Sequence, residues 1–293
     1  MILSRLRGYE LKAISMKEEG MHKYALNTST ISMFHLSADQ QIDIAIDAGY
    51  DAIELWMGDI YKYVETGNSL SELAKKMSDG NLEYSNTIAF QRWCSSDRIV
   101  RRQALENIKH EMDIIKILGG KAYAAPPYKI ESGTSLEDIA YFFSELVRLG
   151  RSMGIEPYLE FWGHSPILNS LEDAHEVLKK SSEKAVKVLA DTYHIYKGGG
   201  DLEYLRSLKG TQIGVFHIND YPQMSRDEIT DEDRVFPGEG IVKWQIYREI
   251  IGSIQYEGVF SLELFLKDNR GKSAFQLAEM GLKSSKRAME QFI

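Results

Sequence analysis

A regular alternation of short apolar runs with amphipathic stretches, repeated through residues 21–293, constrains this sequence more than any other feature. The amphipathic stretches carry apolar residues at helical spacing and predict helices at residues 37–48, 69–77, 99–118, 135–153, 170–181, 201–208, 243–254 and 273–292. The apolar runs predict buried strands at residues 24–27, 51–56, 81–90, 121–125, 157–161, 185–190, 212–218 and 258–265. Strands that alternate with helices form a parallel sheet, and eight such units close into a barrel. The predicted fold is therefore an α/β protein, a single (β/α)8 TIM barrel.

Several predicted helices begin and end at recognisable capping residues. Ser37 stands at the N-cap of the first helix with Gln40 three residues later, which is the capping-box spacing, and Gly49 is placed to end that helix. Ser170 and Asp173 repeat the spacing at the start of another helix, with Asp in place of the preferred Glu. These local signals support the predicted boundaries.

The composition disfavours several classes of protein. A net charge of −8 at pH 7 argues against a nucleic-acid partner, because phosphate backbones are bound by clustered Lys and Arg. No uninterrupted apolar run approaches the roughly 18 residues that a membrane helix needs, so we expect no membrane partner. The single cysteine, Cys94, rules out an intramolecular disulfide and suits the reducing cytoplasm, where we expect the protein. The oligomeric state stays open, and a homo-oligomer is compatible with the sequence.

Residues 1–20 mix Arg, Lys and Glu and lack the apolar centre of a signal peptide. We expect this segment to be an N-terminal extension without chemistry: an extra helix, a disordered tail, or upstream sequence read from too early a start. Met21 directly precedes the first strand, so the catalytic barrel is expected to occupy residues 21–293.

Four polar residues lie among apolar neighbours near the ends of the last four predicted strands: Glu160, Asp191, His217 and Glu263. Barrel enzymes carry their chemistry at these strand ends. A lone acidic residue in such a run is usually a buried, hydrogen-bonded structural group. Three converging carboxylates, however, would repel one another, and each would be costly to bury unpaired. A divalent cation resolves both problems, and the oxygen and nitrogen donors without a thiolate predict one Mn²⁺, Zn²⁺, Co²⁺ or Mg²⁺ ion.

Two further polar residues are candidates for substrate contacts. His194 lies three residues after Asp191. It is a candidate metal ligand, a candidate hydrogen-bond donor to a residue that binds the metal, or a candidate hydrogen-bond partner for substrate. Because the set of four ligands is complete without it, we assign His194 to one of the last two roles. Arg234 follows the seventh predicted strand and is a candidate to hold a substrate oxygen, although its acidic neighbours read as a solvated charge run.

The roles of the aromatic residues and glycines near the same strand ends are predicted less specifically. Trp56, Trp162 and Phe236 are candidates to wall a sugar-sized pocket, but each alone is better explained by core packing. The glycines at residues 198–200 lack the Lys of a phosphate-binding loop and predict a flexible loop that admits substrate.

Longer motifs surround these residues, at positions 159–164, 191–194, 217–220, 230–238 and 261–265. On these motifs the chain from Met21 onward resembles the sugar isomerase/epimerase superfamily of xylose isomerase-like barrels, and within it is most similar to the inosose (keto-inositol) isomerases. The resemblance implies that the family's metal ligands fall on the four residues reached above on physical grounds: Glu160, Asp191, His217 and Glu263.

Two other branches of the superfamily fit less well. Endonuclease IV holds a three-metal cluster that would call for His two positions after Asp233, where this chain has Val235. The ketulose 3-epimerases carry a substrate-binding Glu six residues after the first ligand, where this chain has Pro166. Both departures favour the inosose-isomerase branch.

The resemblance implies a metal-dependent isomerase or epimerase of an unphosphorylated sugar or cyclitol ketone, with a role in inositol catabolism. Glu160 and Glu263 would remove and return a proton next to the carbonyl through an enediolate. Two alternatives remain. A dehydratase of the inosose or 3-dehydroshikimate type shares the enolate but expels a hydroxyl group, and a barrel without catalysis would only bind carbohydrate.

Overall fold

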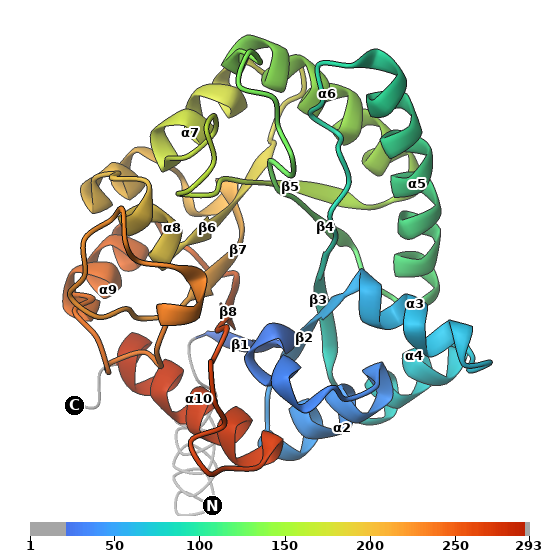
Figure 1. The fold of residues 1–293 in the computed structure, drawn as a ribbon, viewed down its shortest axis with the longest axis vertical. Helices are drawn as coiled ribbons and strands as arrows, with labels where there is room; N and C mark the ends of the chain where they lie inside the picture. Colours follow the sequence, from blue (N-terminus) through green and yellow to red (C-terminus); the bar gives the residue numbers. More distant parts are fainter. Residues whose placement is uncertain (1–21, 291–293) are drawn as a thin grey trace, which may run out of the picture.

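Eight parallel strands form the centre of the computed structural model, which describes residues 22–290 (Figure 1). The strands are β1 Lys23–Asn27, β2 Ala52–Trp56, β3 Glu83–Ile88, β4 Ala122–Ala125, β5 Glu156–Glu160, β6 Lys187–Asp191, β7 Ile213–Ile218 and β8 Val259–Leu262. Their hydrogen-bonded order is β3-β2-β1-β8-β7-β6-β5-β4. Because β3 and β4 at the two ends of this order also lie side by side, the barrel is nearly closed (Figure 1). The predicted (β/α)8 TIM barrel is confirmed.

Helices surround the strands on the outside (Figure 1). Seven of them follow the predicted positions: α2 Ala38–Ala48, α4 Leu70–Asp79, α5 Arg98–Ile117, α6 Leu136–Met153, α7 Leu171–Lys180, α9 Trp244–Ser253 and α10 Ala274–Met289. Ser37 and Gln40 form the predicted capping box, and Gly49 ends α2 in the left-handed conformation with φ 84°. The expectation for residues 1–20 lies outside the described residues. No helix within residues 22–290 is long and apolar enough to cross a bilayer.

Several short elements depart from the prediction. The segments η1 Thr28–Phe34, α3 Met57–Glu65 and α8 Thr192–Lys197 were not predicted, and each begins at the residue that follows a strand. The predicted helix at 201–208 is a 3-10 helix, η2 Leu202–Ser207, and two further 3-10 turns are η3 Gly210–Gln212 and η4 Asp231–Asp233. These three segments have 7, 9 and 6 residues, which is too short for helical periodicity to mark them clearly.

The glycines at residues 198–200 have a packing role that the sequence did not indicate. Gly198 ends α8, and a Cβ atom at this position would lie 1.9 Å from the carbonyl oxygen of Asn169. Gly199 has φ 79°, where glycine is favoured. We therefore correct the predicted substrate-admitting loop to a tight connection that packs α8 against residue 169.

Inside the barrel, the inward-facing side chains form layers, and the strand register places a polar layer next to apolar ones. Side chains two residues apart on a strand point to the same face. Two buried apolar groups lie inside the barrel, one of Ala25, Ala52 and Val259 and the other of Ile88, Ala124, Leu189 and Val215. The next inward position on most of these strands is polar. Register pairs join these positions: Asn27 with Glu54, Glu54 with Asn86, Asp191 with His217, and His217 with Ser261.

Candidate metal centre

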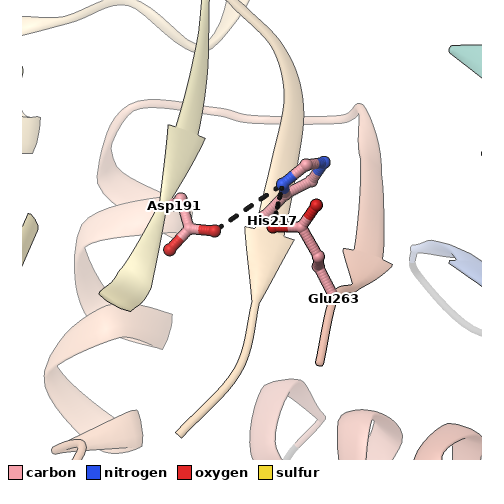
Figure 2. Close-up of side chains that lie close together, drawn as sticks. All are labelled: Asp191, His217 and Glu263. Carbon is pink, nitrogen blue, oxygen red and sulfur yellow. Dashed lines mark hydrogen bonds and ion pairs between the residues drawn. The ribbon is translucent and has the colours of Figure 1, made fainter. Parts of the chain in front are cut away.

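Three side chains converge at the carboxyl end of the barrel (Figure 2). Asp191 is the last residue of β6, His217 lies in β7, and Glu263 directly follows β8. One ligand atom from each lies within 4.8 Å of the other two, and all three residues are buried. Nδ1 of His217 is 3.1 Å from Oε2 of Glu263 and 3.6 Å from Oδ2 of Asp191. The structure thus brings together three of the four predicted ligands.

The fourth predicted ligand, Glu160, ends β5 and lies outside this group of three. Its Oε1 atom accepts a hydrogen bond of 2.9 Å from Nε1 of Trp162. Burial, reinforced by the negative charge of Glu263, raises the pKa of Glu160 to about 8. Burial therefore favours the protonated form of Glu160 in the metal-free protein.

Glu54 in β2 orients the imidazole of His217 and is not among the residues predicted for the site. Its Oε2 atom lies 2.8 Å from Nε2 of His217, which leaves Nδ1 facing Asp191 and Glu263. A metal-binding His commonly holds a carboxylate on its other ring nitrogen in this way. The sequence carried a signal for Glu54, since it is an acidic residue inside the apolar run at 51–56, the same pattern that marked the four predicted ligands.

Amide and hydroxyl donors fix Glu54 in turn. Asn86 donates to its Oε1 over 2.8 Å, Asn27 donates to its Oε2 over 3.3 Å, and the hydroxyl of Ser261 donates to Oε2. Burial would raise the pKa of Glu54, but the charge of His217 and these donors outweigh it and lower that pKa. Burial likewise opposes the charged form of His217, yet Glu263 and Glu54 raise the pKa of the imidazole well above its ordinary value.

Arg234 was predicted to contact a substrate oxygen. In the structure it contacts two of the predicted metal ligands directly. Its Nη1 atom donates to Oε2 of Glu263 over 2.8 Å and to Oδ2 of Asp191 over 3.1 Å. Its Nη2 atom pairs with Asp231. The guanidinium is 1% exposed and packs over the ring of Tyr193, 4.4 Å from the ring centroid. Burial would raise the pKa of Asp191, but Arg234 and then His194 outweigh it, and the pKa of Asp191 is lowered.

The loop at residues 220–242 carries Arg234 to the candidate metal centre. The buried carboxylate of Asp220 holds this loop in place. This carboxylate accepts hydrogen bonds from the backbone N–H groups of Gly238 at 2.9 Å and Val242 at 3.0 Å, and from Nε1 of Trp244 at 3.0 Å. The backbone of Asp220 also pairs with that of Val235, the residue next to Arg234. The position of Arg234 therefore depends on contacts made at both ends of residues 220–242.

His194 lies in the short helix α8, where Asp191 is the N-cap and accepts a hydrogen bond of 3.0 Å from the backbone N–H of His194. Gly163 donates its backbone N–H to Nδ1 of the ring over 3.3 Å. Nε2 lies 3.3 Å from Nη2 of Arg234. Burial lowers the pKa of His194 to about 4, so the ring is neutral near pH 7.

A cavity of about 800 Å³ opens onto the group. Glu160, Glu263, His194 and Arg234 line it together with the two predicted tryptophans, Trp56 and Trp162. A third aromatic candidate was wrong: Phe236 is fully buried and packs in the core with Leu262, Leu264 and Leu277. The cavity therefore joins acid–base groups to aromatic walls.

The donor set fits one divalent cation. Two carboxylates and an imidazole nitrogen lie close together, a third carboxylate lines the same cavity, and the set contains no thiolate. Such oxygen and nitrogen donors suit Mn²⁺, Zn²⁺, Co²⁺ or Mg²⁺. Without an ion, Arg234 pairs with the carboxylates of Asp191 and Glu263, and His217 pairs with Glu263.

Comparison with known proteins gives consistent results. The model of the xylose isomerase-like TIM barrel family matches residues 42–286. The chain is 26% identical over 248 residues to inosose isomerase of Bacillus velezensis, covering 83% of this chain and 88% of that protein. It is 22% identical over 252 residues to 3-dehydroshikimate dehydratase of Pseudomonas putida, covering 84% of this chain and 39% of that protein. The solved structure of the IolI protein with a binding zinc atom superposes with a TM-score of 0.85 at 24% identity, covering 92% of this chain and 99% of that chain.

Proposed function

Because this chain belongs to the xylose isomerase-like TIM barrel family, we propose that it is a divalent-metal-dependent isomerase or epimerase. Its substrate would be an unphosphorylated keto-polyol or sugar of the inosose type. The observation that carries the proposal is the buried group of Asp191, His217 and Glu263 at a cavity that Glu160 also lines. The likeness to inosose isomerase of Bacillus velezensis and the zinc atom bound to the IolI protein support it.

In this proposal Asp191, His217 and Glu263 hold the ion, and Glu160, which lines the same cavity, completes the set. The bound ion would supply Lewis-acid polarisation of a substrate carbonyl, which makes the neighbouring C–H acidic. Glu54 fixes the ring of His217 through Nε2, so that Nδ1 stays directed at the centre. The buried carboxylate of Glu54 thus orients the metal-binding residue His217 and does not itself bind the ion.

Proton transfer next to the carbonyl is assigned to Glu160 and Glu263. Both carboxylates line the cavity, so each can reach a substrate bound there. A bound cation would lower the pKa of Glu160 from its raised value in the metal-free protein, so the acidified C–H of the substrate must compensate for the weaker base. Arg234 and His194 are assigned to substrate oxygens, and Trp56 and Trp162 to the faces of the ring.

The test is a screen of inososes, ketohexoses and 3-dehydroshikimate with the Mn²⁺-loaded protein in D₂O, read by NMR. Deuterium incorporated next to the carbonyl reports enolisation even when the net reaction is unknown. The proposal fails if the metal-loaded protein exchanges none of these protons faster than Mn²⁺ alone does.

A dehydratase is the second candidate, and the likeness to 3-dehydroshikimate dehydratase of Pseudomonas putida favours it. It would form the same enolate and then expel a β-hydroxyl group as water. Loss of one water from the product mass, with the ultraviolet absorbance of a conjugated enone, separates this reaction from isomerisation. A barrel that only binds carbohydrate would show neither exchange nor a requirement for stoichiometric metal.

A further inference from the structure

His164 lines the cavity at the candidate metal centre, and the proposed reaction gives it no role. It lies in a tight turn after β5, in which the backbone N–H of Ser165 donates to the carbonyl oxygen of Trp162 over 2.7 Å. A Cβ atom at Gly163 would lie 2.6 Å from the backbone nitrogen of Gly198, so this turn packs closely against the end of α8. Packing therefore fixes the place of His164 in the cavity wall.

The ring of His164 stacks on Trp162, which also contacts the proposed acid–base group Glu160. The centroids of the two rings are 5.3 Å apart, and the ring planes are inclined by 29°. Nε1 of the same indole donates to Oε1 of Glu160 over 2.9 Å. One indole thus joins His164 to Glu160, and all three side chains line the same cavity.

The two ring nitrogens of His164 have different surroundings. Nδ1 lies 4.0 Å from Oδ2 of Asp231, whose other oxygen pairs with Arg234. This separation is longer than a hydrogen bond, but the carboxylate still favours a proton on Nδ1, and such contacts tighten when substrate binds. Within residues 22–290 Nε2 has no hydrogen-bond partner, and 47% of the His164 side chain is exposed. The lone pair of Nε2 is therefore free to accept a proton from a bound molecule.

The other histidine of this cavity, His194, is less suited to carry a proton. Its Nδ1 atom accepts the backbone N–H of Gly163 over 3.3 Å, and its Nε2 atom lies 3.3 Å from Nη2 of Arg234. Its ring is only 2% exposed. A proton that moved on and off this ring would disturb one of these contacts, whereas His164 can exchange a proton at Nε2 without losing a protein contact.

The groups around His164 keep its ring neutral near pH 7. Burial lowers the pKa of His164, which Asp231 opposes from the loop after β7. Arg234 in the same loop and Lys197 in α8 lower that pKa further. A neutral imidazole can accept a proton, and the imidazolium ion that forms can return it.

We propose that His164 carries the proton that must move between two substrate oxygens when a carbonyl group shifts to the neighbouring carbon. The inference rests on the proposed function for the first step. In that step a carboxylate removes the proton from the carbon that bears the hydroxyl, the electron pair forms the carbon–carbon double bond, and the carbonyl oxygen gains the negative charge.

The role of His164 follows this first step. Nε2 takes the proton of the hydroxyl group and returns it to the other oxygen, so that the negative charge moves to the first oxygen and the ring ends neutral. The carboxylate then gives its proton to the former carbonyl carbon, and the new carbonyl forms. The site would therefore move a carbonyl group, which epimerisation does not require.

The test compares carbonyl migration with deuterium exchange on the Mn²⁺-loaded full chain in D₂O, both read by NMR on an inosose. We expect His164→Gln to lower the ratio of carbonyl migration to exchange at least about 100-fold, the usual contribution of one acid–base group. His110→Gln replaces an exposed histidine of α5 and should keep the ratio of the parent. An unchanged ratio in His164→Gln, whether both rates persist or both fall, overturns the inference.

A second measurement needs neither metal nor substrate. Nitrogen-15 NMR of the metal-free full chain at pH 7 reports which ring nitrogen of each histidine carries a proton, and the His164 signals are those that His164→Gln lacks. We expect a neutral His164 ring with its proton on Nδ1, toward Asp231. A proton on Nε2 overturns the inference, because this nitrogen could not then accept the hydroxyl proton.

Failure of the inference and failure of the proposed function give different results. If the parent protein exchanges no proton of any ketone, the proposed function falls and the inference falls with it. If the parent exchanges protons but leaves every carbonyl in place, only the inference falls, and enolisation stands. The same holds if the carbonyl migrates as readily, relative to exchange, in His164→Gln as in the parent.

Discussion

The two nitrogens of His217 face carboxylates on opposite sides: Nε2 lies 2.8 Å from Glu54, and Nδ1 faces Asp191 and Glu263. Because Glu54 fixes the ring without facing the centre, Glu54→Gln should keep the fold but weaken metal binding about 10- to 100-fold. Competition with a chelator measures this loss. Glu83→Gln is the control, since Glu83 pairs with Lys23 at the exposed start of β3. Unchanged affinity in Glu54→Gln would contradict the orienting role.

Replacing Glu160 or Glu263 should lower the exchange rate in both cases but should lower metal affinity by different amounts. We expect Glu160→Gln and Glu263→Gln each to lower the rate of deuterium exchange by at least about 100-fold, because each removes one acid–base group. Metal affinity should fall further in Glu263→Gln, because Glu263 belongs to the close group of three and Glu160 does not. Equilibrium metal binding and circular dichroism accompany the exchange assay. Full exchange in both folded variants would sink the assignment.

Arg234 should contribute more to the stability of the metal-free protein than to that of the metal-loaded protein. Arg234→Met leaves Asp191 and Glu263 without their shared cation, and breaking a buried ion pair costs about 3–5 kcal/mol. Denaturant unfolding with EDTA measures this loss, and added Mn²⁺ should restore more stability to the variant than to the parent. The control is Arg270→Met, whose partly exposed pair with Glu239 should contribute at most about 1 kcal/mol. An equal loss in both variants would argue against a special role for Arg234.

Stability should depend on pH through Glu111, away from the metal centre. Glu111 is buried on α5 and accepts hydrogen bonds from Tyr123 at 2.7 Å and Gln91 at 2.7 Å, while burial raises its pKa above 4.5. As the pH rises above the ordinary pKa of Glu, the unfolded chain loses this proton first. The free energy of unfolding therefore falls up to the raised folded-state pKa.

Replacing Glu111 removes this dependence. The difference in unfolding free energy between the parent and Glu111→Gln should shift in favour of the variant as the pH rises from 4 through 7, measured by urea denaturation at each pH. Glu106→Gln removes an exposed carboxylate from the same helix and serves as the control. A difference that stays constant with pH would show that Glu111 does not titrate anomalously.

Gly240 should be needed for the loop that carries Arg234. A Cβ at this position would lie 2.2 Å from Oδ1 of Asp220 and 2.2 Å from the carbonyl oxygen of Tyr221. Gly240→Ala should therefore destabilise the protein by about 1–3 kcal/mol and weaken deuterium exchange, because Arg234 shifts with the loop. Gly58→Ala on α3 meets no atom within 4 Å and should be neutral or stabilising. Thermal unfolding compares the two, and equal melting temperatures would contradict the prediction.

The sequence sufficed for the barrel because each long element carries its own pattern. Apolar runs and helical spacing placed the eight strands and seven of the helices, and capping residues such as Ser37 and Gly49 gave their ends. Asp191, His217 and Glu263 could be anticipated because each is a polar residue at an apolar strand end, and parallel strands bring such ends together. Glu54 carried the same pattern and could have been found by applying it to every strand.

Other features depend on contacts between residues far apart in the sequence. The place of Arg234 is fixed by Asp220, whose partners Gly238, Val242 and Trp244 are specified by the folded loop and not by any local pattern. Phe236 lies two residues from Arg234, yet its side chain turns into the core. Aromatic residues near a strand end are equally suited to a core or a cavity, so the sequence could not separate Phe236 from Trp56 and Trp162.

The hydrogen bond from Asn27 to Glu263 joins residues 236 positions apart, the first strand to the end of the last. During synthesis the first half of the barrel supplies Asn27, Glu54 and Asn86, and the second half supplies Glu160, Asp191, His217 and Glu263. A nascent chain therefore holds the orienting groups long before it holds the group that would bind the ion, and the two sets meet only once β8 has left the ribosome. Metal uptake would then require the completed barrel.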